Sequence, residues 1–258
     1  MRELGVKPSR AVFAALAALE SFDGVNPSQS LANISRRIGT PKATALRTLR
    51  ALEVKGYVTL NEAEGTYSLA VGVLTLAQRY LTRYEALAIA RPILAQVAAE
   101  TGETAHYGVL QGNEVIYLEI AESPQRVRAY VVRGDHLPAH CVAAGKAILA
   151  HADPAVIEAL VSAGLPRLTP ATIVRAKAFL SDLRVTRQRG YALNIGEWME
   201  DVVGVSAPVF GHLGTVQGAV GIAGPRSRLN GRNVHQIGRL VHRYAEGISK
   251  KLGGSLAA

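Results

Sequence analysis

The feature that most constrains the fold is an ordered series of helix signals in the first third of the chain. A short stretch, residues 31–38, ends at Gly39. Thr40 and Pro41 then start a second helix, because a hydroxyl at the N-cap followed by proline in the first turn is a strong start signal. This helix is expected to run from Pro41 to about Lys55. Two short helices joined by a turn that contains glycine form a helix-turn-helix motif.

Additional elements are predicted on both sides of this motif. Before it, residues 10–21 are expected to form a helix, with Ser9 as its N-cap and with Val12, Leu16 and Leu19 as its buried stripe.

After the motif, residues 57–60 and 66–69 are predicted to be two strands on either side of a polar turn. A hairpin that follows three helices is the wing of a winged helix, so this part of the chain is expected to be a winged helix-turn-helix domain.

The helix that starts at Thr40 has one apolar and one basic face. Ala45, Leu49 and Leu52 recur at i, i+4 and i+7 and are expected in the core, whereas Arg47 and Arg50 face outward. A single basic helix is often only a solvated surface, but the ordered set of signals favours DNA binding, in which cations neutralise phosphates and a helix tip reads base edges. The candidate DNA-binding residues are Arg36, Thr40, Lys42, Ala43, Thr44, Leu46, Arg47, Arg50 and Tyr67.

Leu46 is expected on the outer face of this helix, which is unusual for a leucine on a solvated helix. A thymine methyl group or a protein partner could account for it.

The charge distribution agrees with a polyanionic partner. Residues 1–80 hold ten Lys and Arg against six Asp and Glu, a net charge of +4, and residues 81–258 hold nineteen against fourteen, a net charge of +5. The shorter segment therefore carries the denser positive charge, although basic balance alone is a weak signal.

Several classes of protein are excluded by composition. A single cysteine, Cys141, excludes a disulfide framework and a cysteine-rich zinc site, and no cofactor motif is present. The longest uncharged apolar run near the start, residues 11–19, is too short to span a membrane, and the first residues do not resemble a secretory signal. His140 and Cys141 are adjacent but no catalytic signature surrounds them. We expect a cytoplasmic protein that is not an enzyme and has no membrane or metal partner.

Residues 72–100 are almost continuously compatible with helix. Pro92 must start or kink a helix, so two helices that meet near Arg91 are predicted. Their apolar rows suit either a dimerisation helix or a buried interdomain helix, and the sequence alone does not choose between them.

The rest of the chain predicts an α+β domain with an antiparallel sheet, because its strands are grouped between helices. The expected strands are residues 104–110, 114–121, 126–132, 191–194, 202–210 and 216–222, and the expected helices are residues 143–150, 154–163, 172–188 and 233–252.

Residues 31–52, followed by Gly56-Tyr-Val, closely resemble the DNA-binding domain of the IclR family of bacterial transcription regulators. The Ala-Gly-Lys-Ala segment within residues 140–150, the Arg-Gly-Tyr-Ala segment that ends at residue 192 and the strand of residues 219–225 match the family's effector domain in order.

The resemblance implies three parts: a winged helix-turn-helix domain (residues 1–71), linker or dimerisation helices (72–100) and a GAF-like effector-binding domain (101–258), whose antiparallel sheet is flanked by helices. It implies a regulator of a catabolic operon that binds a pseudo-palindromic double-stranded DNA operator as a homodimer or a homotetramer and responds to a small organic acid. Ala43 replaces a serine that is usual in the family. The alternative is a GAF-like small-molecule sensor whose N-terminal domain contacts protein.

The resemblance also implies an effector pocket, with the carboxylate of the effector on the backbone amides of Ala143 and Ala144. An Asp, a Cys and two Ser positions of the family are Asn194, Gly204, Gly221 and Ala223 here, so a less polar and roomier pocket is expected. Trp198, as an aromatic wall, would favour a larger and aromatic acid, unless it is ordinary packing. The candidate effector-binding residues are His140, Cys141, Ala143, Ala144, Asn194, Glu197, Trp198, Val202, Gly204, Gly221 and Ala223.

Overall fold

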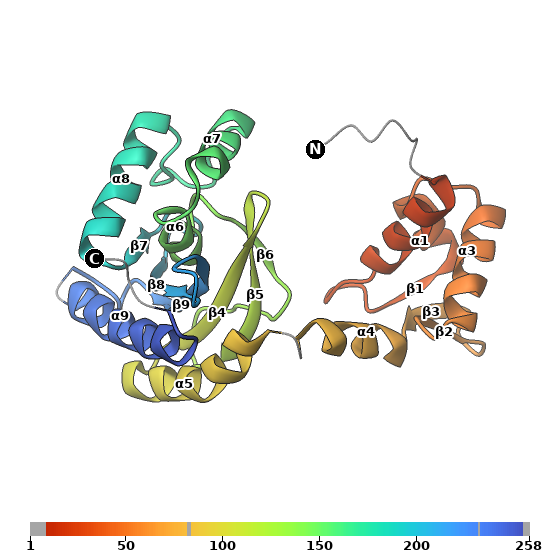
Figure 1. Cartoon of the computed structure of the whole chain (residues 1–258). Helices are drawn as coiled ribbons and strands as arrows, with labels where there is room; N and C mark the ends of the chain where they lie inside the picture. The colour runs from red at the N-terminus through yellow and green to blue at the C-terminus, as the bar shows by residue number, and fades with distance from the viewer. Residues whose placement is uncertain (1–8, 82–83, 232, 255–258) are drawn as a thin grey trace. The chain divides into compact units, whose positions relative to one another are not determined.

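The computed structural model describes residues 9–81, 84–231 and 233–254. Internal contacts divide the chain into two compact units, Met1–Arg83 and Tyr84–Ala258. The mixed α+β class that the sequence predicts is confirmed, with a helix-turn-helix in the first unit and an antiparallel sheet with helices in the second (Figure 1). Within the described residues, no helix is long and apolar enough to cross a membrane.

The first unit combines helices with a small antiparallel sheet of strand order β1-β3-β2. Its elements are α1 (Arg10–Glu20), β1 (Ser28–Ser30), α2 (Leu31–Arg37), α3 (Lys42–Val54), β2 (Val58–Asn61), β3 (Thr66–Leu69) and α4 (Val71–Leu81). The predicted hairpin is confirmed as β2 and β3, and β1, which the sequence did not predict, pairs with the outer edge of β3.

The turn between α2 and α3 is fixed by local hydrogen bonds. The Ser30 hydroxyl accepts a hydrogen bond from the Asn33 amide and caps α2. Gly39 has a φ of 63°, a left-handed conformation that only glycine adopts without strain. The Ser35 hydroxyl donates to the Thr40 carbonyl at 2.6 Å, and the Thr40 amide donates to the Ser35 carbonyl. These hydrogen bonds fix the conformation of the turn that joins α2 to α3.

One of the two predictions about helix starts is wrong. The N-cap of α3 is Pro41 rather than Thr40, and no side chain caps this helix. Ser9 does occupy the N-cap position of α1, but its side chain makes no capping hydrogen bond.

The predicted buried stripe of α1 is also wrong. Val12 and Leu16 are exposed, whereas Ala14 and Ala18 are buried. The core of this unit therefore receives Ala18 and Phe22 from α1 and the residues after it, and of the predicted stripe only Leu19 packs against it.

The second unit is a six-stranded antiparallel sheet of order β6-β5-β4-β9-β8-β7. Helices α5 and α9 pack together on one face and α6 lies against the other, with α7 and α8 beyond it (Figure 1). The strands are β4 (Thr104–Gln111), β5 (Glu114–Ala121), β6 (His136–Pro138), β7 (Ala192–Ile195), β8 (Val202–Phe210) and β9 (Val216–Pro225). The helices are α5 (Glu85–Thr101), α6 (Ala143–Leu149), α7 (Pro154–Ala163), α8 (Ala176–Arg189) and α9 (Val234–Lys251).

The central strands are buried on both faces, because helices cover both sides of the sheet. All but the first residue of β8 are buried. In α9, Val234, Gly238, Val241, Ala245 and Ile248 recur every three or four residues and form its buried stripe.

The predicted strand at residues 126–132 is wrong. The segment has no regular structure, and the place beside β5 is taken by β6. Its alternation of basic and apolar residues imitates a strand, yet Val127 and Tyr130 are exposed. Ala129 is buried, and its carbonyl accepts a hydrogen bond from the Thr104 hydroxyl at 3.1 Å.

The predicted helix break near Arg91 is wrong as well. Helix α4 ends at Leu81, α5 begins at Glu85, and α5 runs through Pro92 without interruption. Pro92 lies on the solvent side of α5, where water can satisfy the carbonyl that loses its helical partner. The expected connector is thus divided, with α4 in the first unit and α5 in the second.

Candidate DNA-binding surface and effector cavity

Helix α3 presents opposite faces to the core and to solvent. Ala45 and Leu49 are fully buried and Leu52 is nearly so, as the sequence predicts. A helix rotates by about 100° per residue, so Arg47 and Arg50 point away from this core, and both are exposed. In the described part of the chain, neither arginine forms an ion pair. Their guanidinium groups are available to an external anion.

The other predicted contacts on and near α3 divide by exposure. Lys42, Ala43 and Arg36 are exposed, whereas Thr40, Thr44 and Leu46 are half-buried. Leu46 is therefore not on the outer face as expected, because it lies at the border between the core and the exposed side of the helix.

A groove of about 880 Å³ lies beside α3, and its walls come from α1 and α3. Thr40, Thr44 and Arg47 line this groove, together with small alanine residues of α1. The N-terminal turn of α3 is thus open to solvent on the α1 side.

Tyr67 does not belong to this surface. Its side chain is 5% exposed and packs in the core of the first unit with Leu49 and Val58. The prediction that Tyr67 contacts DNA is wrong, because the inward side of β3 holds the wing against α3. Near Arg36, Arg37 is already paired with Asp23 at 2.8 Å, and this arginine holds the pKa of the Asp23 carboxyl at about 2.

The second unit contains a small enclosed cavity between the sheet and the start of α6. Its volume is about 20 Å³, which is room for about one water molecule. Predicted effector residues that line it are Ala143, Asn194, Trp198, Val202, Gly204 and Ala223. The other lining residues were not predicted from the sequence: His106, Tyr117, Val131, Leu137 and Val142.

The expectation of a roomier pocket is wrong for this conformation. Residues 204 and 223 are a glycine and an alanine, but the aromatic side chains of His106, Tyr117 and Trp198 line the same small cavity. Neither His106 nor Tyr117 belongs to a sequence motif that indicates ligand binding. The only available signal was their place on strands that face the start of α6.

Five predicted effector residues do not line the cavity: His140, Cys141, Ala144, Glu197 and Gly221. The His140 ring contacts the Pro166 carbonyl at 2.9 Å, and the Cys141 thiol donates to the Pro138 carbonyl. Burial raises the pKa of Cys141 to about 12, so its sulfur is a packed thiol rather than a nucleophile. In this conformation the side chains of His140 and Cys141 therefore do not line the cavity.

Glu197 has a structural role. Its Oε1 lies 2.5 Å from the Lys146 Nζ, which is also 3.0 Å from Asp182 Oδ2. The Lys146 side chain is 1% exposed, so the Lys146–Glu197 pair is buried. Burial raises the pKa of the Glu197 carboxyl, and the nearby ammonium opposes that shift only in part.

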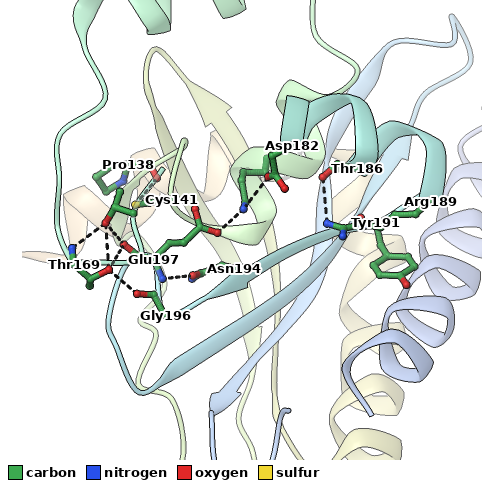
Figure 2. A network of polar contacts seen from close by, with 12 residues as sticks. Pro138, Cys141, Thr169, Asp182, Thr186, Arg189, Tyr191, Asn194, Gly196 and Glu197 are labelled. Carbon is green, nitrogen blue, oxygen red and sulfur yellow. Dashed lines mark hydrogen bonds and ion pairs between the residues drawn. The ribbon is translucent and has the colours of Figure 1, made fainter. Parts of the chain in front are cut away.

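The same network holds the turn between β7 and β8, which carries Trp198. Asn194 Oδ1 accepts a hydrogen bond from the Glu197 amide at 2.8 Å. The Thr169 hydroxyl donates to the Gly196 carbonyl, and the Thr172 hydroxyl donates to the Glu197 carbonyl. Figure 2 shows Thr169, Asn194, Gly196 and Glu197 converging on this turn. The backbone of this turn is thus bonded to the loop before α8, and the Glu197 side chain bonds it to α6, whereas the Trp198 indole takes part in none of these contacts.

A helix-turn-helix unit with a cationic exposed helix, followed by a unit that encloses a cavity beside a helix N-terminus, defines a class: DNA-binding transcriptional regulators with a ligand-binding domain. Two family models match the chain, the IclR helix-turn-helix domain over residues 11–62 and the bacterial transcriptional regulator IclR C-terminal domain over residues 78–250. The chain belongs to the IclR family of transcriptional regulators, which are not enzymes.

Known relatives span nearly the whole chain. The transcriptional repressor AllR of Escherichia coli K12 is 28% identical over 248 residues, which cover 96% of this chain and 92% of AllR. The IclR transcriptional regulator of Alicyclobacillus acidocaldarius has a TM-score of 0.85 at 29% identity, covering 96% of this chain and all of that one. An IclR homolog from Microbacterium hydrocarbonoxydans, solved in complex with 4-hydroxybenzoate, has a TM-score of 0.83 at 26% identity. The match covers 94% of this chain and 98% of that one. Because the first unit matches the helix-turn-helix domain of this family, the alternative of a sensor whose N-terminal domain only contacts protein is not supported.

Proposed function

We propose that this regulator binds a pseudo-palindromic operator of a catabolic operon in the cytoplasm, as a dimer or a dimer of dimers, and responds to a small aromatic organic acid. The observation that carries the DNA-binding part is the exposed face of α3, where Arg47 and Arg50 stand opposite the core without ion-pair partners in the described residues. A recognition helix needs such unpaired cations at its surface to bind phosphates and base edges.

Apolar side chains on the first unit support self-association. No described residue of α4 is buried, and Leu74 and Leu76 are 58% and 55% exposed. Val12, Phe13 and Leu16 of α1 are also exposed. Large apolar side chains that are exposed along one helix are typical of interfaces. A two-fold axis through such a surface would present two α3 helices to two half-sites.

Arg47→Ala tests DNA binding. We expect this variant to lose about 1–3 kcal/mol of binding free energy, which is about 5- to 150-fold in affinity, for DNA from its own promoter region. The loss follows from the removal of a guanidinium contact to a base or a phosphate. Fluorescence anisotropy with a labelled duplex at fixed salt measures it.

Arg187→Ala is the matched control, because it removes the same charge from an exposed position on α8 in the other unit. It should leave DNA affinity close to wild type. Equal losses in the two variants would mean that the overall charge, and not α3, determines binding.

The cavity supports the effector part of the proposal. Ala143 is the first residue of α6 and lines the cavity, and the first amides of a helix have no helical acceptor. We place the effector carboxylate there, where the amides and the helix dipole favour an anion. Aromatic and aliphatic side chains line the rest, which suits a ring, and a relative is known in complex with 4-hydroxybenzoate.

A ring cannot enter about 20 Å³, since small-molecule pockets usually measure about 300–1,000 Å³. Binding therefore requires the outer wall to move. Trp198, Val131 and Leu137 are half-buried members of that wall, whereas the inner wall is the rigid sheet. We propose that effector binding displaces this outer wall.

Trp198 reports this movement directly, because it is the only tryptophan of the chain. We expect titration with benzoate to shift or quench its emission in a saturable way, as the ring enters and changes the polarity around the indole. Benzyl alcohol, which has the ring but no carboxylate, is the control and should produce little change. A similar saturable change with both compounds would contradict the role of the carboxylate.

A further inference from the structure

Three residues lie side by side across the centre of the sheet of the second unit. His106 on β4 pairs with Gly221 on β9, and Gly221 pairs with Ser206 on β8. All three are buried. Neighbouring residues in such a row point to the same face of a sheet, so the side chains of His106 and Ser206 face each other across Gly221.

Glycine at position 221 is what allows them to meet. The His106 Nε2 and the Ser206 Oγ are 3.3 Å apart. A Cβ atom at residue 221 would lie 2.0 Å from that Oγ and 2.8 Å from that Nε2, so any side chain would force the two apart. The contact depends on the absence of a side chain at this one position.

The other nitrogen of the ring has no hydrogen-bond partner within the described part of the chain. His106 is 2% exposed, and its Nδ1 is buried without a hydrogen bond to any described residue. The ring lines the cavity, and edge-to-face contact with Tyr117, at 4.9 Å between centroids, fixes its plane. A buried polar atom without a partner is unfavourable, and because this one belongs to a ring that lines the cavity, a ligand in the cavity could satisfy it.

The charge state of the ring selects the kind of group that it can bind. Burial lowers the pKa of His106 to about 3, so the imidazole is neutral at the pH of a cell. Because the Ser206 hydroxyl can donate or accept at Nε2, the Nδ1 can be either the acceptor or the donor of the next bond. A hydroxyl group on the ligand can satisfy either arrangement, whereas a carboxylate can only accept and would bring a charge without a countercharge.

We propose that His106 is a specificity-determining residue of the effector cavity: its Nδ1 hydrogen-bonds an uncharged hydroxyl group on the ring of the effector, while Ser206 and Gly221 position the imidazole. This inference rests on the proposed binding of an aromatic acid in the same cavity. It adds that a hydroxylated acid binds more tightly than the same acid without its hydroxyl group.

Calorimetric titration of the full chain with benzoate and with 2-, 3- and 4-hydroxybenzoate tests the proposal. We expect at least one hydroxybenzoate to bind about tenfold more tightly than benzoate, which corresponds to one net hydrogen bond. In His106→Phe, which keeps an aromatic ring beside Tyr117 but has no ring nitrogen, the ratio of the hydroxybenzoate affinity to the benzoate affinity should fall below about threefold.

Gly221→Ala is a second variant that leaves both polar side chains in place. Its added methyl group separates His106 from Ser206, so it should also reduce the preference for the hydroxylated acid. A thermal melt of each variant shows whether it is folded. If neither variant folds, imidazole ¹⁵N shifts of the wild type decide, because the His106 Nδ1 signal should move with the preferred hydroxybenzoate and much less with benzoate.

The outcomes separate this inference from the function on which it rests. If all four acids bind with equal affinity to the wild type, or if the preference is unchanged in His106→Phe, the role of His106 is overturned and the aromatic-acid effector stands. If none of the acids binds, both are overturned. A hydroxyl preference that is lost in both variants supports the proposal.

Discussion

Replacement of Lys146 by methionine is expected to lower the free energy of unfolding of the second unit by about 3–5 kcal/mol. The Lys146 ammonium is almost fully buried and lies 2.5 Å from Glu197, whose other carboxylate oxygen has no hydrogen bond to a described residue. Removal of the cation leaves a carboxylate in a site with little solvent, a much larger cost than the loss of a surface ion pair. Urea unfolding at neutral pH measures the change.

Arg91→Met is the matched control, because Arg91 is exposed and pairs with the buried carboxylate of Glu119. Glu119 keeps Arg133 as its second partner, so this variant should lose less than about 1 kcal/mol. The double variant Lys146→Met, Glu197→Met should recover part of the loss, since no buried charge is then left alone in that pair. If Lys146→Met were as stable as the wild type, the description of the Lys146–Glu197 pair would be contradicted.

Acid should destabilise the second unit through His106. In the folded protein burial lowers the pKa of this ring to about 3, against about 6.5 in the unfolded chain. Above about pH 6.5 both states are neutral and the ring contributes nothing to the pH dependence. Below that pH the unfolded chain binds a proton that the folded protein cannot bind. At about pH 4.5 this favours unfolding by roughly 2–3 kcal/mol.

His106→Phe should therefore lose less stability than the wild type between about pH 7 and pH 4.5, and the difference should be roughly 2–3 kcal/mol in urea unfolding. Ser206→Ala is the control, because it removes the hydroxyl partner but keeps the buried imidazole, so its loss over the same range should resemble the wild type. If wild type and His106→Phe had parallel pH profiles, the ring would not be buried and neutral as described.

The sequence predicted the DNA-binding unit better than it predicted the effector cavity, for a physical reason. The elements of the first unit depend on local signals. Ser30 caps α2, Gly39 takes a left-handed conformation, and Leu49 belongs to a row of apolar residues that recur at helical spacing along α3. Where the prediction failed, on α1, the buried residues are Ala14 and Ala18 and the larger Val12 and Leu16 are exposed, so the spacing of large apolar residues did not mark the buried face.

The cavity could be predicted only in part, because its walls come from segments far apart in the chain. The resemblance to a family indicated Ala143 and Asn194, which do line the cavity, but it also indicated Cys141 and Glu197, which pack behind it. His106 carries no local signal, since its importance arises from a strand register and from the absence of a side chain at Gly221. Such long-range effects cannot be read from spacing or composition.

The pairing of β4 with β9 has a consequence for biosynthesis. It joins Thr104 to Ala223, so the two halves of the sheet remain separate on the ribosome until the last strand has left the exit tunnel. The contacts of the helix-turn-helix unit lie within residues 1–83, and domains made first generally fold first. Long-range strand pairing is slow in comparison. A nascent regulator therefore acquires its DNA-reading helix well before it can respond to a metabolite, and a chain truncated before β9 would lack the central partner of its sheet.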